Sequence, residues 1–199
     1  MRIFLLLGLL LLPGEASADS AYQTGSRLCA SMQDLKAPLA PGPACADFRA
    51  AHVALVAYAR DAIGGCGQAD QRFGSLKESL SRACGSQPGS DGCGQAMVAA
   101  DADFASLEPG FGAIKARNEK PVLASFPAQG QRIASSCLPL LDAYQQFAYG
   151  ISGALNDSTR VVQGERSSLR QRVGALLKSR NAAPPSAPAS AAVGHPLSN

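Results

Sequence analysis

The chain contains no tryptophan, only two histidines and few β-branched residues. Scarce valine, isoleucine and threonine beside abundant alanine disfavour β-sheet and favour helix. No two cysteines have the C-x-x-C spacing, and one of the two histidines, His195, lies in a segment rich in proline and alanine near the end of the chain. The sequence therefore predicts an all-α fold and offers no zinc site.

Recognisable catalytic motifs are also absent: there is no G-x-S-x-G, no H-E-x-x-H and no G-x-x-x-x-G-K. His52 is near Asp47 and Asp61 in sequence only, and we interpret it as a neutral histidine packed between helices. Asp101 and Asp103 are two residues apart, so on a helix they point to different faces and form part of a solvated acidic surface. We assign no catalytic, cofactor-binding or metal-binding residue. An enzyme or enzyme inhibitor with an unrecognised site remains the alternative.

The first 18 residues have the pattern of a secretory signal peptide. Met1-Arg2 is followed by an unbroken apolar run from Ile3 to Leu12, and Ala16-Ser17-Ala18 provides small residues for cleavage before Asp19. A membrane-spanning helix needs roughly 20 apolar residues, so this run is too short for a permanent anchor. We expect export to the periplasm or the exterior of a cell, and the composition is typical of bacteria.

All six cysteines follow this segment. An even number of cysteines in an exported chain indicates disulfides, here three. The cysteines are Cys29, Cys45, Cys66, Cys84, Cys93 and Cys137.

Helix length limits how these cysteines pair. Cys45 and Cys66 lie at opposite ends of a predicted helix over 44–63, which separates them by roughly 30 Å, whereas a disulfide needs Cα atoms within about 7 Å. The same argument excludes Cys66 with Cys84. Cys84–Cys93 closes a short turn and is favoured. For the remaining four cysteines an up-and-down bundle favours Cys29–Cys45 with Cys66–Cys137, and ranks Cys29–Cys137 lower.

Apolar residues recur at helical spacing and predict a single up-and-down bundle of five or six helices. Gly64-Gly65 is expected to end the second helix. The predicted helices span 20–36, 44–63, 68–83, 94–107 and a short piece over 111–118, followed by helical sequence to Arg180.

At two positions of the last helical region, the sequence allows alternative interpretations of where a helix begins or breaks. Pro139 either lies in the first turn of a helix that begins near Ser136 or kinks a longer helix, and the apolar stripe upstream favours the kink. An unbroken helix from Pro139 to Arg180 would be about 60 Å long, so either the helix breaks near Asn156 or its tip projects beyond the neighbouring helices. We divide the chain into a signal peptide (1–18), a helical domain (19–180) and a disordered Pro/Ala/Ser tail (181–199).

Charge is unevenly distributed although the formal net charge is only +3. Residues 85–114 carry acidic side chains and no basic ones, whereas 158–180 is strongly basic. We consider the arginines of the last helix the candidate partner-binding residues; as alternatives they only solvate the helix or pair with the acidic segment. These residues are Arg160, Arg166, Arg170 and Arg172.

The function that this pattern favours is that of an exported soluble helical binding or scaffold protein of the cell envelope, acting through protein–protein contacts. The expected partner is another envelope or secreted protein, and the basic helix could also contact an anionic surface. Nucleic acid is not expected, because no aromatic residues alternate with the basic ones.

Overall fold

The computed structural model describes residues 28–128 and 131–182. The expected signal peptide, and the expected tail from residue 183 onward, lie outside the described residues. Within the described ranges every secondary-structure element is a helix and there is no strand, which confirms the predicted all-α class.

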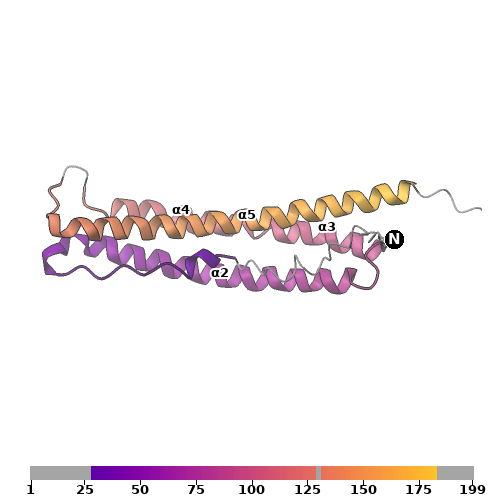
Figure 1. The fold of residues 1–199 in the computed structure, drawn as a ribbon, viewed down its shortest axis with the longest axis horizontal. Coiled ribbons are helices and arrows are strands. Elements are labelled where there is room, and N and C mark those ends of the chain that lie inside the picture. The colour runs from indigo at the N-terminus through magenta and orange to yellow at the C-terminus, as the bar shows by residue number, and fades with distance from the viewer. Residues whose placement is uncertain (1–27, 129–130, 183–199) are drawn as a thin grey trace, which may run out of the picture.

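Four α-helices form a long bundle of three segments that run side by side, which we call legs (Figure 1). The first and third legs are single helices of 36 and 45 residues, and the middle leg consists of two shorter helices that follow one another. The α-helices are α2 (Arg49–Cys84), α3 (Asp91–Ala105), α4 (Glu108–Ala124) and α5 (Leu138–Ala182). Short 3-10 helices are η1 (Ala30–Met32), η2 (Pro43–Phe48) and η3 (Ser135–Cys137).

The predicted count of five or six helices is wrong, chiefly because α2 combines two predicted helices. Gly64-Gly65 does not end the helix, although a glycine within a helix costs roughly 1 kcal/mol relative to alanine. The neighbouring Ala62 and Cys66 are buried, and packing outweighs the local preference. Gly65 itself has a structural role, because a Cβ atom there would overlap the side chain of Ile114 on α4.

Helix α5 is continuous from Leu138 to Ala182, so of the two alternatives the structure adopts the unbroken helix, without a break near Asn156. The preferred kink at Pro139 is wrong: this proline is in the first turn, where its missing N–H removes no helical hydrogen bond. Ser158 is buried inside α5, and its hydroxyl accepts a hydrogen bond from the Cys29 N–H at 2.7 Å.

The remaining differences are at the start of the chain and in α4. Of the predicted helix over 20–36 the structure describes residues 28–36, and the only helical element among them is the short 3-10 helix η1. The short piece expected over 111–118 is instead a helix of 17 residues, α4.

The core is apolar and follows the three legs along their length. Phe73 of α2 and Phe104 of α3 have ring centroids 5.2 Å apart. Near the other end, Phe48 meets Tyr144 of α5 edge-on at 6.0 Å. The first contact connects α2 to α3, and the second connects η2, which directly precedes α2, to α5.

The chain's own N-terminal segment covers the seam between α2 and α5. The Leu28 N–H donates to Asp70 of α2 at 2.9 Å, and the Tyr144 hydroxyl of α5 donates to the Leu39 carbonyl at 2.9 Å. Between them, Leu35 packs where Gly150 of α5 leaves room, because a Cβ there would overlap the leucine.

Three disulfides fix this arrangement, and one confirms the prediction: Cys84–Cys93, with Cα atoms 4.7 Å apart, joins α2 to α3. The other two predicted pairings are wrong. Because α2 is continuous, Cys66 lies along its length, where Cys29 reaches it at a Cα distance of 6.0 Å. Cys45 and Cys137 lie next to the starts of α2 and α5, and their Cα atoms are 5.7 Å apart.

Three disulfides are typical of proteins from an oxidising compartment outside the cytosol. Among the helices that the structure describes, none combines the length and the apolar character needed to cross a membrane.

Candidate binding groove between α2 and α4

Two of the four arginines predicted to bind a partner form ion pairs with other helices of the bundle. Arg166 of α5 donates from Nε to Asp101 of α3 at 3.0 Å and from Nη1 to Glu108 of α4. Arg170 adds a second contact to Asp101, with Nη2 3.0 Å from the carboxylate. We call Arg166, Asp101 and Glu108 the arginine clasp; it ties α5 to both helices of the middle leg.

The clasp keeps both carboxylates ionised. Partial burial raises the pKa of Asp101 and of Glu108, but hydrogen bonds from the arginines outweigh it and hold each pKa below its ordinary value. The same contacts raise the pKa of Arg166. These charges therefore serve the fold at neutral pH.

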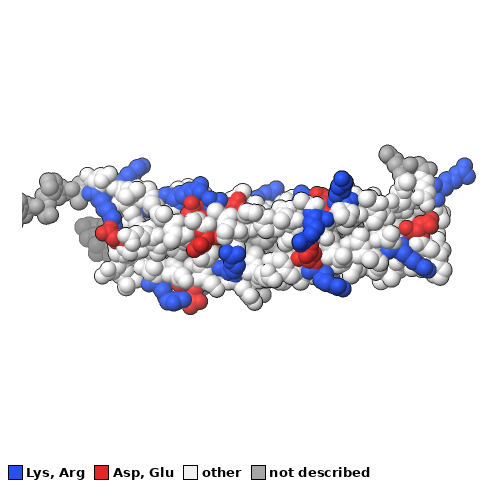
Figure 2. Space-filling view, turned by 180° about the vertical axis from the view of Figure 1, so that it is seen from behind, with Lys and Arg blue, Asp and Glu red and all other residues white. Residues whose placement is uncertain are grey.

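The other two predicted arginines lie on the exposed side of α5. Arg160 pairs with Asp157 of its own helix at 2.9 Å. Arg172 is exposed. On the face drawn in Figure 2, basic and acidic side chains lie beside one another rather than in a large patch of one sign.

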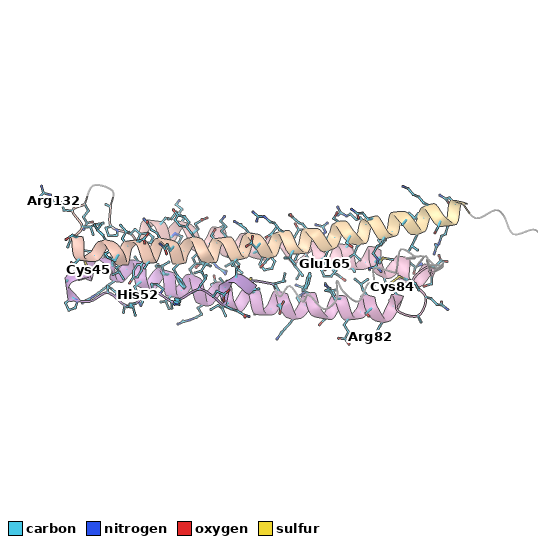
Figure 3. All side chains as sticks on the ribbon, in the orientation of Figure 1. Cys45, His52, Arg82, Cys84, Arg132 and Glu165 are labelled. Atoms are coloured by element: carbon cyan, nitrogen blue, oxygen red, sulfur yellow. A yellow bond between two sulfur atoms is a disulfide. The ribbon has the colours of Figure 1, made fainter. Side chains whose placement is uncertain are left out.

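His52 lies in the half of α2 nearest Cys45 (Figure 3), where its ring is 5.9 Å from that of Tyr144. Its buried Nδ1 has no hydrogen-bond partner among the described residues. The two acids near it in sequence have other partners, since Asp47 accepts from Gln131 and Asp61 accepts from α4. The described residues therefore place no carboxylate against this imidazole. They also contain no group of three His, Cys, Asp or Glu side chains that could hold a metal ion.

Tyr58 is the second residue of α2 with a buried polar atom that has no hydrogen-bond partner among the described residues. Burial, together with the negative charge of Glu119, raises its pKa to about 12, although the nearby Ser152 hydroxyl acts in the opposite direction. The phenol is therefore protonated at neutral pH, and it is buried to 1% exposure.

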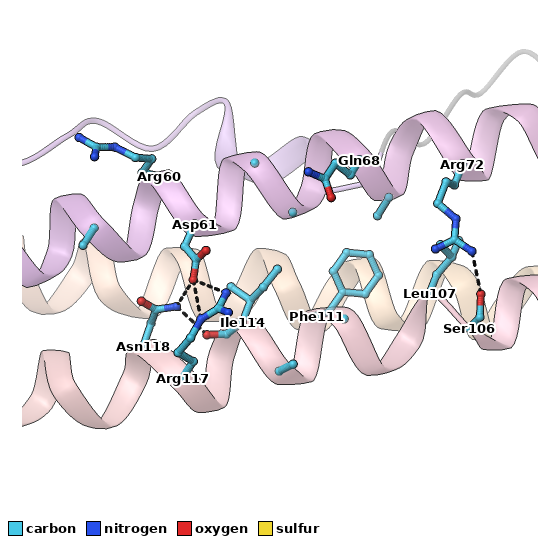
Figure 4. A pocket seen from close by; sticks show the side chains of 16 residues that line it. Arg60, Asp61, Gln68, Arg72, Ser106, Leu107, Phe111, Ile114, Arg117 and Asn118 are labelled. Atoms are coloured by element: carbon cyan, nitrogen blue, oxygen red, sulfur yellow. Dashed lines mark hydrogen bonds and ion pairs between the residues drawn. The ribbon is translucent and has the colours of Figure 1, made fainter.

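A concave surface lies between α2 and α4, a groove of about 780 Å³ (Figure 4). We call it the α2/α4 groove. Small residues line much of it, so the two helices present little side-chain bulk there. These residues are Ala57, Gly64, Gly65, Ala69, Gly110 and Ala113.

Polar side chains surround this small-residue surface. Asp61 accepts hydrogen bonds from Arg117 Nε at 3.0 Å and from Asn118 Nδ2 at 2.6 Å. The Asn118 hydrogen bond, followed by that of Arg117, lowers the pKa of Asp61. At the other end Arg72 donates to the Ser106 hydroxyl at 3.1 Å (Figure 4).

Sequence reasoning missed this groove, because it treated Gly64-Gly65 as a helix end. The signal was present, since glycine and alanine recur along α2 at positions that share one face. Gly64 and Gly110 have no neighbouring atom within 4 Å of where a Cβ would lie. At these two positions the backbone is exposed to solvent.

Comparison of the chain with models of protein families, with characterised proteins and with solved structures found no match. The functional argument therefore rests on the groove and its chemistry.

Proposed function

We propose that this is an exported helical protein of the bacterial cell envelope that binds another envelope or secreted protein. The proposed contact surface is the α2/α4 groove. Export is supported by the signal-peptide pattern of residues 1–18 and by the three disulfides, which suit the periplasm or the cell exterior.

The main support for the proposal is a wide groove between two helices that a disulfide and an ion-pair cluster hold in place. Helix α2 is joined by Cys84–Cys93 to α3, while the clasp of Arg166 holds α4 against α5. A surface held in this way needs little reordering on binding, which reduces the entropic cost of association. Small residues between the walls allow another backbone to approach closely.

The enzyme alternative finds less support in the same groove. Its one lining carboxylate, Asp61, is already bound by Arg117 and Asn118. These contacts lower its pKa, so it is a poor proton donor at neutral pH and a weak base.

A second candidate surface is the exposed side of α5 that the sequence suggested. Gln163, Arg166, Ser167, Arg170 and Gln171 line a shallow depression there of about 380 Å³. Arg166 and Arg170 already contact Asp101, so the charge available to a partner is reduced.

Position-specific photo-cross-linking in the producing cells distinguishes the two surfaces. A photoreactive amino acid replaces either Gln68, which lines the α2/α4 groove, or Gln171, which lies on the basic side of α5. Both side chains are exposed glutamines on long helices, so each position controls for the other.

We expect a discrete covalent adduct from position 68 and none from position 171. An adduct from position 171 alone would assign the contact to α5 and contradict the groove. The absence of an adduct from both positions would contradict binding through either surface.

A further inference from the structure

The described N-terminal residues 28–39 cover the seam between α2 and α5 in one half of the bundle, and we call them the strap. We call the remaining part of this seam, from Asp70 to Cys84 of α2, the distal seam. We propose that residues 19–27, the start of the chain after the expected cleavage, extend the strap along the distal seam. The proposal does not depend on the α2/α4 groove.

The strap runs along the bundle in one direction. Its Leu39 carbonyl accepts from Tyr144, and its Cys29 N–H donates to Ser158, which is 14 residues further along α5. From residue 39 back to residue 29 the strap therefore advances about 21 Å toward the end of the bundle where α2 meets α3. On the same path, residues 19–27 enter the distal seam.

The distal seam has a length that nine residues can cover. From Asp70 to Cys84 helix α2 rises by about 21 Å at 1.5 Å per residue. The strap between Leu39 and Cys29 advances by about 2 Å per residue, and a fully extended chain by about 3.3 Å. At these rates residues 19–27 span about 19 to 30 Å, so they reach the end of the seam.

Two rows of side chains line the distal seam. Each row starts at a residue that the strap contacts, Asp70 on α2 and Ser158 on α5. The rows continue at spacings of three and four residues, which keep side chains on one face of a helix. Lys77 of the first row and Glu165 of the second form an ion pair at 2.8 Å, so the rows face each other. They therefore continue the surface on which the strap lies.

Apolar side chains of these rows are less well covered than those beside the strap. Leu80 of the α2 row and Val161 of the α5 row are only half-buried. Ala154, one turn before the residue of α5 that Cys29 contacts, is 1% exposed. A chain segment over the distal seam would remove the half-buried apolar surface from water, which is favourable.

Tyr22 is suited to cover Leu80. It is the one large apolar residue among residues 19–27. It precedes Leu28 by six residues, or about 13 to 20 Å at the rates given above. Leu80 lies about 15 Å beyond Asp70, the residue that Leu28 contacts. The ring therefore falls beside Leu80, and its hydroxyl can stay in water.

The test uses the absence of tryptophan from the chain, since one introduced indole then reports on its own surroundings. Tyr22→Trp places the indole in the proposed extension of the strap. The matched control is Tyr149→Trp, because Tyr149 is a tyrosine of α5 that is 67% exposed. Acrylamide quenching and the emission wavelength are measured on the exported, oxidised proteins, and melting temperatures establish that both are folded.

We expect the indole at position 22 to be quenched about threefold less than the indole at position 149, and to emit at a shorter wavelength, because packing excludes water and quencher. A second measurement uses a photoreactive amino acid at position 22. It should form a cross-link within the same chain, to the peptide of α2 that contains Leu80.

Equal quenching at positions 22 and 149 in folded proteins would overturn the proposal. So would a cross-link from position 22 to a second copy or to another protein, because the distal seam would then have a different occupant. If the indole at position 22 prevents folding, the cross-link decides alone, and its absence from the peptide containing Leu80 contradicts the proposal.

Discussion

Replacing both Cys45 and Cys137 with alanine is expected to lower the free energy of unfolding by about 4.6 kcal/mol. Their disulfide joins residues 92 apart in sequence and ties the start of α2 to the start of α5. A cross-link over so long a loop removes much of the conformational entropy of the unfolded chain. Urea unfolding of the oxidised proteins measures the loss.

The matched control is the alanine pair at Cys84 and Cys93, which opens a loop with a sequence separation of only 9. The same entropic argument gives about 3 kcal/mol for this pair. A larger loss at Cys84–Cys93 than at Cys45–Cys137 would contradict the entropic account. Peptide mapping of the wild type without reduction should recover Cys45 bound to Cys137.

Replacing Arg166 with methionine should lower the free energy of unfolding by about 2–3 kcal/mol. Methionine retains most of the aliphatic length but leaves Asp101 and Glu108 without their main cation. Only 23% and 19% of these two side chains are exposed, so solvent compensates them poorly. Arg160→Met is the control, because its pair with Asp157 is exposed and should contribute less than about 1 kcal/mol.

The effect of Arg166→Met should depend on pH. The folded-state pKa values of Asp101 and Glu108 are depressed, so the stability that they provide is complete above their unfolded pKa values near 4. That contribution is lost as the pH falls through the lower folded pKa values. The difference in unfolding free energy between wild type and variant should therefore shrink from pH 7 to pH 3. An equal difference at both pH values would show that the clasp acts by packing rather than by charge.

The sequence predicted helix content well, because alanine-rich amphipathic repeats determine it locally. It also predicted Cys84–Cys93, since a short turn brings these residues together whatever the rest of the chain does. Helix ends were less predictable. Gly64-Gly65 and Pro139 are helix breakers in isolation, but long-range packing keeps the first pair within α2 and an N-terminal position accommodates the proline.

The wrong disulfides follow from the same error. A helix that ended at Gly64-Gly65 would put Cys66 at an end of the bundle, whereas the continuous α2 puts it beside the N-terminal segment. The groove was missed for the same reason, because its small residues line a surface only if α2 continues through Gly64. By contrast, the charge pattern allows the interpretation that the basic segment pairs with the acidic one. The ion pair between Arg166 and Asp101 agrees with that interpretation.

The most direct test of binding through the α2/α4 groove compares Gly64→Leu with Gly74→Leu. Both glycines are exposed on α2 with no atom within 4 Å of where a Cβ would lie, but only Gly64 lines the groove. Replacing glycine with leucine favours helix by roughly 0.8 kcal/mol at either position, so both variants should remain folded. The measurement is the affinity of each variant for the protein trapped from position 68. We expect Gly64→Leu to weaken binding about a hundredfold, or about 2.7 kcal/mol, and Gly74→Leu to leave it unchanged. Equal affinity of the two variants would contradict the groove as the binding surface.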